Sequence, residues 1–219
     1  MKAKAASHRQ PANSVPAEAL SAVVAHELNN IAVPLRGFID LALQTTAADD
    51  PVRHSLDELH VGLDRIGMLA YQLESLAQQS STLSPTTIGA CLAGNPHQLV
   101  WSCSQLTPAK VDVDHVRRSV TSLLHLAGPG PLLIGESAGD GLACAACEKP
   151  FARGNVLEIQ ARGVRPAVFA AIGAPFQASQ KLRAMQRLAV ATLSHCVHLA
   201  GGHLVAHPSA DALGIMLPK

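Results

Sequence analysis

Residues 24–42, VAHELNNIAVPLRGFIDLA, carry the pattern that decides the first part of the fold. Apolar side chains recur here at alternating spacings of four and three, the repeat of a helix that packs in a bundle. We call these apolar positions the first seam: Val24, Leu28, Ile31, Leu35, Phe38 and Ala42. The pattern predicts a helix over residues 17–46, beginning after Pro16.

A second helix with the same repeat is predicted over residues 51–80. Residues 47–51, AADDP, supply a capping Asp and a helix-opening Pro. The second seam consists of Val52, Leu56, Leu59, Leu63, Ile66, Ala70, Leu73 and Ala77. A hairpin with one apolar seam per helix cannot bury it alone, so the pattern favours two hairpins in a four-helix bundle and predicts a homodimer.

Three polar residues lie between the apolar positions of the first seam: His26, Glu27 and Asn30. In a heptad that places Leu28 at a, His26 falls at f and points away from the first seam, toward solvent. Asn30 stacks one turn from His26 on the same face, and Glu27 is adjacent. A neutral imidazole is a nucleophile near neutral pH, and Glu27 is the candidate to fix its tautomer and raise its basicity.

The run from Ala25 to Asn30, AHELNN, resembles the phosphoacceptor box of two-component sensor histidine kinases. The resemblance implies that His26 carries a phosphoryl group and that Asn30 helps to place water for dephosphorylation. It also implies that Asn29 and Arg36 face a response-regulator receiver domain. Arg36, on the polar side of the helix, either contacts that partner or simply solvates the helix.

Composition limits the other classes of function. The chain has 219 residues, enough for one or two small domains, with 48% hydrophobic and 15% charged residues. A net charge of +1 and 3% aromatic residues disfavour a nucleic-acid partner. The sequence shows no signal peptide and no apolar run of roughly 18 residues, so we expect a cytoplasmic protein without a membrane segment. Five cysteines fit a reducing compartment.

The sequence predicts an α+β protein in three parts. These are a disordered N-terminus (1–16), a dimerisation and phosphoacceptor hairpin (17–84) and an α/β sandwich (85–219). In the last part we expect helices over 111–126 and 181–200, and strands over 132–135, 156–160, 168–172, 203–206 and 213–217.

The end of the chain is similar to the C-terminus of histidine-kinase ATP-binding domains of the GHKL type. Over residues 188–218 a helix is followed by Gly201-Gly202 and by two strands that end in Leu217-Pro218. Together with the AHELNN run, this segment implies that both domains of such kinases are present, in the right order. The expected fold is therefore a degenerate Bergerat-type sandwich.

The groups that bind ATP in this family are missing. The family uses an asparagine for magnesium, an aspartate in D-x-G-x-G for adenine, and a glycine-rich lid for the phosphates. Where the asparagines belong, residues 142–153 offer Glu148 and Ala152, and after the strand 168–172 the chain offers Gly173-Ala-Pro-Phe176. The lid region, 177–181, has no glycine. We expect ATP and magnesium binding to be lost, and predict no other cofactor and no metal.

These observations lead to a histidine phosphotransfer protein as the main hypothesis. His26 would pass a phosphoryl group between response-regulator aspartates without using ATP. Two alternatives keep the fold. One is a pseudokinase scaffold that binds or inhibits a kinase or regulator, and the other is a diverged, active histidine kinase.

A distant alternative is an α/β-hydrolase. Leu132 to Gly139 is a predicted strand followed by G-x-S-x-G, which looks like a nucleophile elbow around Ser137. The required order of an acid before a histidine fails after Ser137 unless Glu158 serves as the acid.

Two further groups of residues are of types that can bind metals. Cys144 and Cys147 form a single C-x-x-C with no second pair, which favours small apolar packing on a helix. The histidines near the C-terminus have no carboxylate beside them, which favours core or surface roles: His195, His198, His203 and His207.

Overall fold

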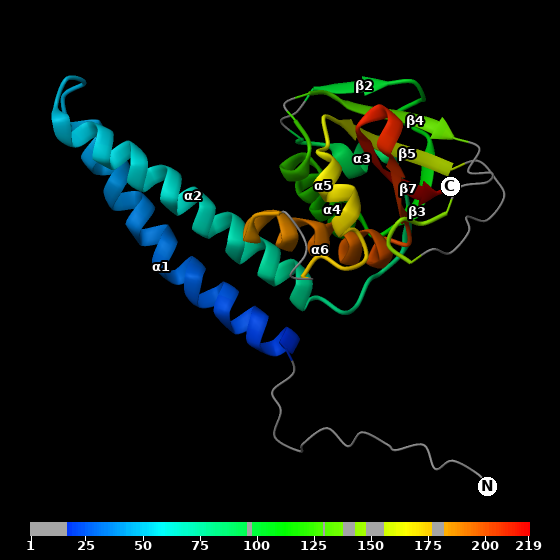
Figure 1. Cartoon of the computed structure of the whole chain (residues 1–219), viewed down its shortest axis with the longest axis horizontal. Helices are drawn as coiled ribbons and strands as arrows, with labels where there is room; N and C mark the ends of the chain where they lie inside the picture. The colour runs from blue at the N-terminus through cyan, green and yellow to red at the C-terminus, as the bar shows by residue number, and fades with distance from the viewer. Residues whose placement is uncertain (1–16, 96–97, 129, 138–142, 148–155, 177–181) are drawn as a thin grey trace, which may run out of the picture. The chain divides into compact units, whose positions relative to one another are not determined.

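The computed structural model describes residues 17–95, 98–128, 130–137, 143–147, 156–176 and 182–219 (Figure 1). Contacts group the chain into two compact units, Met1–Ala70 and Tyr71–Lys219. The first is a helical hairpin, and the second is a layered unit of helices on a sheet. The predicted α+β class is confirmed.

The hairpin consists of α1 (Ala17–Thr45) and α2 (Pro51–Ala77), close to the two predicted helices. Hydrogen bonds to the start of α2 and to the end of α1 hold the turn of the hairpin in place. The Asp50 carboxylate accepts a hydrogen bond of 2.8 Å from the backbone N–H of Val52, in the first turn of α2. Arg53 donates to the carbonyl oxygens of Leu43 (3.1 Å) and Thr46 (2.9 Å) at the end of α1. These bonds satisfy carbonyls that a helix end leaves without partners.

The buried stripe of α1 lies beside the first seam and does not coincide with it. Ala25 and Ala32 are 1% and 7% exposed, and they occupy e positions in the heptad that places Leu28 at a. Ile31 and Phe38, which belong to the seam, are 59% and 69% exposed. The reason is that small alanines let two helices approach closely, which leaves the larger a and d side chains uncovered.

The second unit contains a five-stranded sheet of order β2-β4-β5-β7-β6. The strands are β2 (Leu99–Trp101), β4 (Leu132–Ser137), β5 (Val156–Arg162), β6 (His203–His207) and β7 (Ala212–Pro218). Only β2 and β4 run parallel, and the other neighbours are antiparallel. A separate two-stranded sheet pairs β1 (Ser84–Thr87) with β3 (Pro108–Val111).

Two helices, α4 (Val113–Leu126) and α6 (Ala184–Leu199), pack beside each other and supply one layer of the core. The short helices α3 (Ile88–Leu92) and α5 (Pro166–Ala171) and a 3₁₀ turn, Pro208–Ala210, complete the unit. Alternate residues of β5 are buried, as expected for a strand with one face on the core. The largest side chains that are fully buried include Leu123, Ile159, Leu193 and Ile215.

The predicted strand over 168–172 is wrong. Residues Pro166–Ala171 form helix α5, with Pro166 at its first position. Proline there has the backbone angle of a helix and lacks only an N–H that would be unbonded anyway. A short apolar run such as Val168 to Ile172 does not distinguish strand from helix by its period.

The last turns of α2, from Tyr71 onward, belong to the second unit. Arg118 of α4 joins them to the sandwich. Its guanidinium donates to the Ser75 hydroxyl (2.9 Å), lies 3.5 Å from the Glu74 carboxylate and sits over the Tyr71 ring at 5.2 Å from its centroid. The boundary between the two compact units therefore falls within α2, whereas the sequence predicts a boundary after residue 84.

Candidate functional site

The exposed face of α1 around His26 is the candidate site. His26 is exposed, while the neighbouring Ala25 is buried. The prediction that His26 reaches solvent is therefore confirmed, whereas most of the seam that was expected to be buried behind it is exposed. An imidazole in this position is open to a second protein.

Glu27 and Asn30 are exposed beside His26, and Asn29 is half-buried. His26 and Asn30 are one turn apart on α1, which places their side chains on one face. Within the described residues, no hydrogen bond or ion pair joins Glu27 to His26. The role of Glu27 in setting the tautomer of His26 stays a prediction.

Arg36 forms an ion pair with Asp64 of α2. The neighbouring His60 of α2 lies 3.2 Å from the Asp40 carboxylate of α1 and 4.0 Å from Asp64. These four side chains form a polar cluster across the hairpin. Arg36 is therefore held by α2 and not simply solvated, and its proposed contact with a partner would use a guanidinium already positioned by Asp64.

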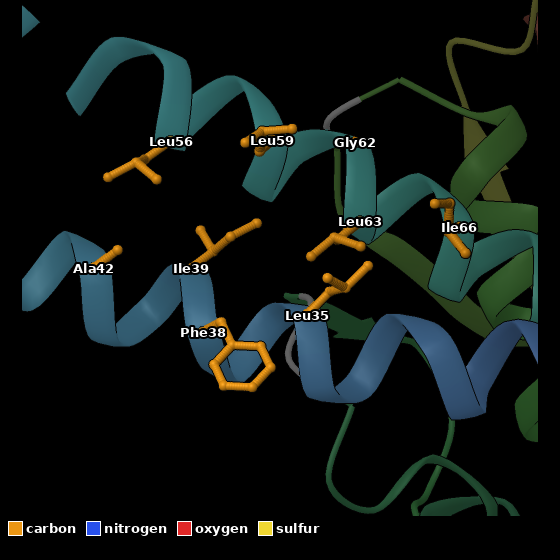
Figure 2. Close-up of a pocket in the computed structure, with 9 residues that line it drawn as sticks. All are labelled: Leu35, Phe38, Ile39, Ala42, Leu56, Leu59, Gly62, Leu63 and Ile66. Carbon is orange, nitrogen blue, oxygen red and sulfur yellow. The ribbon is translucent and has the colours of Figure 1, made fainter. Parts of the chain in front are cut away.

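An apolar groove of about 530 Å³ runs along the hairpin. Figure 2 shows Leu35, Ile39 and Leu63 between the two helices, whereas the ring of Phe38 points away from α2. Leu35 and Leu59, which line the groove, are 44% and 57% exposed. Exposed apolar side chains that line one groove are typical of a surface that another protein segment covers.

The regions assigned to ATP binding differ from the expectation or lie outside the described residues. Residues 148–155 and 177–181, which include the expected asparagine positions and lid, are outside the described part of the chain. The strand placed before Gly173 is a helix. The strand that precedes α5 is β5, and no Asp or Glu occurs between Glu158 and Asp211.

The Glu158 carboxylate contacts residues of strands β6 and β7. It accepts a hydrogen bond of 2.8 Å from Nε2 of His207, and a Cβ on Gly214 would lie 2.5 Å from its Oε1. Glu158 therefore contacts the adjacent strand and a histidine. Because no other acidic residue lies between Glu158 and Asp211, we still expect that no carboxylate binds adenine.

The hydrolase alternative, which depends on a turn just after Ser137, stays a prediction. A nucleophile elbow needs a sharp turn from strand to helix at the serine. Ser137 is the last residue of β4 and pairs with Val156 of the antiparallel strand β5. Residues 138–142, which complete the motif, lie outside the described part of the chain.

The C-x-x-C segment lies in a turn, where a helix was expected, and two of the C-terminal histidines lie beside it. The ligand atoms of Cys144, Cys147, His198 and His203 are all within 4.8 Å of one another. The other two histidines are engaged elsewhere: His195 Nε2 lies 2.6 Å from the carbonyl oxygen of Gln78, and His207 contacts Glu158. The sequence shows the H-x₄-H spacing across a helix end, but it does not show that the C-x-x-C turn lies beside these two histidines.

Comparisons with known proteins give structural similarities only. No family model and no curated protein matches the chain. A structure titled as the Acinetobacter baumannii histidine kinase AdeS is 13% identical, with a TM-score of 0.47, covering 89% of this chain and 96% of its own. A structure titled as a bacterial phosphotransferase is 12% identical, with a TM-score of 0.44, covering 93% and 98%. Among the described helices, none is both long and apolar enough to cross a bilayer.

Proposed function

We propose that this chain is a histidine-containing phosphotransfer protein of a two-component phosphorelay, with His26 as the phosphoacceptor. The observation that carries the proposal is the exposure of His26 on α1, with Asn30 one turn away and the buried Ala25 next to it. An exposed imidazole on a rigid helix is reachable by the acyl phosphate of a second protein, and it needs no deep active site.

The transfer is a displacement at phosphorus. One ring nitrogen of neutral His26 attacks the aspartyl phosphate of a receiver domain, and a P–N bond forms while the P–O bond to the aspartate breaks. The aspartate leaves as a carboxylate, and the imidazole becomes positively charged. Glu27 stabilises that charge from the next position on the helix. Transfer to a second receiver reverses these steps and restores neutral His26.

ATP is not required for this reaction, because the phosphoryl group arrives from an acyl phosphate. The absence of any carboxylate between Glu158 and Asp211 supports this part of the proposal. The receiver domain would dock on α1 beside His26, with Asn29, Asn30 and Arg36 at the contact.

The active form would be a homodimer. Ile31, Leu35 and Phe38 of the first seam are 59%, 44% and 69% exposed, and Leu59 of the second seam is 57% exposed. Both helices keep the four-and-three spacing of a bundle, so a second hairpin offers the same pattern to this face. A four-helix bundle would cover these side chains and leave His26 outside it.

The proposal is tested by comparing phosphoryl donors. The purified full chain is incubated with a radiolabelled phospho-receiver domain from the same cell, or with labelled ATP and magnesium. We expect label from the receiver only, and none in His26→Gln. The matched control His54→Gln removes an exposed histidine of α2 and should leave labelling unchanged. Label from ATP would indicate an active kinase, and no label from either donor would indicate a binding scaffold.

A further inference from the structure

Four side chains with metal-binding atoms meet at one place in the second unit. Cys144 and Cys147 lie in the turn between β4 and β5, His198 lies in the last turn of α6, and His203 begins β6. Cys144 and His198 are 54 positions apart in sequence. The tertiary fold alone therefore brings the two pairs together.

The separations fit a tetrahedral metal ion. Zinc bonds of about 2.3 Å to sulfur and about 2.0–2.1 Å to nitrogen place tetrahedral ligands roughly 3.3–3.8 Å from one another. Sγ of Cys144 and Nε2 of His198 are 3.7 Å apart, and all four ligand atoms lie within 4.8 Å of one another. Small movements of side chains would bring the whole set to bonding distance.

The His198 ring is held in the tautomer that a metal needs. Its Nδ1 lies 2.7 Å from the carbonyl oxygen of Ser194. A carbonyl oxygen only accepts hydrogen bonds, so Nδ1 carries the proton and Nε2 keeps its lone pair, directed at Cys144. Histidines that bind metals generally donate their other N–H in this way.

The backbone fixes the positions of the two pairs. The N–H of Ala145, between the cysteines, donates a hydrogen bond of 2.7 Å to the carbonyl oxygen of Leu204, next to His203. Gly201 has a φ of +79°, which turns the chain sharply between the two histidines. Both elements that carry the ligands are therefore tied to each other before any ion binds.

We propose that Cys144, Cys147, His198 and His203 bind one Zn²⁺ ion in a tetrahedral Cys₂His₂ site. Sulfur and imidazole ligands in this geometry favour zinc over hard cations. Binding replaces the two thiol protons: one Zn²⁺ ion, two thiols and two neutral imidazoles give the neutral complex and two protons. With four protein ligands the site is structural, and it cross-links the turn between β4 and β5 to the junction of α6 and β6.

The exposure and the sequence spacing of the ligands agree with this assignment. Cys144 is 1% exposed, whereas His198 lies at the surface, so the ion can enter from the side of His198. The spacing also matches zinc sites, with two residues between the cysteines and four between the histidines.

The first test is metal analysis of the full chain, purified under reducing conditions and incubated with Zn²⁺. Mass spectrometry of the native protein should show one zinc per chain. Cys147→Ser and His203→Gln should each lower the affinity for zinc by more than about 100-fold. Even the loss of a residue that only hydrogen-bonds to a metal ligand typically lowers metal affinity roughly 10–100-fold. The matched controls Cys103→Ser and His54→Gln should keep the zinc.

A second measurement does not depend on the folding of a variant. Co²⁺ added to the metal-free wild-type chain should give the absorption of a tetrahedral thiolate complex, and Zn²⁺ should remove it. Chelation of zinc supplied at about 100 times its Kd should lower the Tm by roughly 5–10 °C for a chain of this size. Absence of stoichiometric metal, zinc retained in both ligand variants, or a Cys144–Cys147 disulfide under reductant would overturn the assignment.

Discussion

The carboxylate of Asp112 accepts a hydrogen bond of 2.8 Å from the backbone N–H of Thr82, which lies between α2 and β1. The same carboxylate caps α4, because its Oδ1 also accepts from the N–H of His115 at 3.1 Å. One side chain therefore holds the segment that follows the hairpin to the start of a core helix.

Replacing Asp112 should weaken the sandwich in a pH-dependent way. Burial alone would raise the pKa of Asp112, but the hydrogen bonds from Thr82 and His115 outweigh burial and hold it below its usual value. Because the native pKa is lower than the unfolded one, the stabilisation is present above the unfolded pKa, about 3.9. It is lost as the pH falls through the native value.

The measurement is urea unfolding from pH 7 to pH 3. Asp112→Ala should lose about 1–2 kcal/mol of unfolding free energy at pH 7, from the cap alone. Its stability should also fall less steeply below pH 5 than that of the wild type. The control is Asp114→Asn, since Asp114 is 81% exposed and should change little. Equal acid sensitivity of the wild type and Asp112→Ala would contradict this account.

Reactivity toward an alkylating agent should divide four of the five cysteines into three groups. Burial raises the pKa of Cys196 to about 12 and also raises that of Cys91, so both stay protonated at pH 8. We expect alkylation at pH 8 to label Cys103 in the zinc-loaded protein, Cys147 only after chelation, and Cys91 and Cys196 only on unfolding. Peptide mass spectrometry reads each site. Rapid labelling of Cys196 in the folded chain would contradict the burial argument.

Phe38→Glu should abolish the proposed dimer and leave a monomer. Phe38 is 69% exposed in the single chain and lies on the first seam, where a second hairpin would cover it. A buried, unpaired carboxylate in that interface costs several kcal/mol. Sedimentation equilibrium measures the outcome, and circular dichroism checks that helices remain. Gln44→Glu adds the same charge at an exposed position of α1 off the seam and should leave the dimer intact.

Asn30→Ala should prolong the life of the phosphorylated protein. Asn30 is one turn from His26 and exposed, in a position to orient an attacking water. Loss of that orientation should slow hydrolysis roughly 10-fold, without preventing phosphorylation. The decay of label after removal of the receiver gives the rate. An unchanged rate would mean that Asn30 does not place the water.

The long helices could be predicted because their signals are local. The four-and-three spacing of Leu28, Ile31 and Leu35 identifies α1 without any tertiary information. The short strands could not be predicted. Strand β2, for example, has only three residues, Leu99–Trp101, and forms because it pairs with β4. Such strands depend on partners distant in sequence, and a period of two cannot be recognised over three residues.

The two candidate sites also differ in how far the sequence alone identifies them. His26, Glu27 and Asn30 lie within one and a half turns of a single helix, so the sequence alone groups them. Cys144 and His198 meet only after β4, α6 and β6 have packed, and neither pair is a complete ligand set by itself. Local spacing therefore groups the residues around His26, whereas the cluster of cysteines and histidines depends on the tertiary fold.

The most direct test of the central claim is to locate the phosphoryl group. The wild-type chain is incubated with a receiver domain charged by a small acyl phosphate, digested under neutral conditions and analysed by tandem mass spectrometry. The account predicts phosphate on the imidazole of His26 and on no other residue of the chain. Phosphate on another side chain, or none after complete discharge of the receiver, would contradict it.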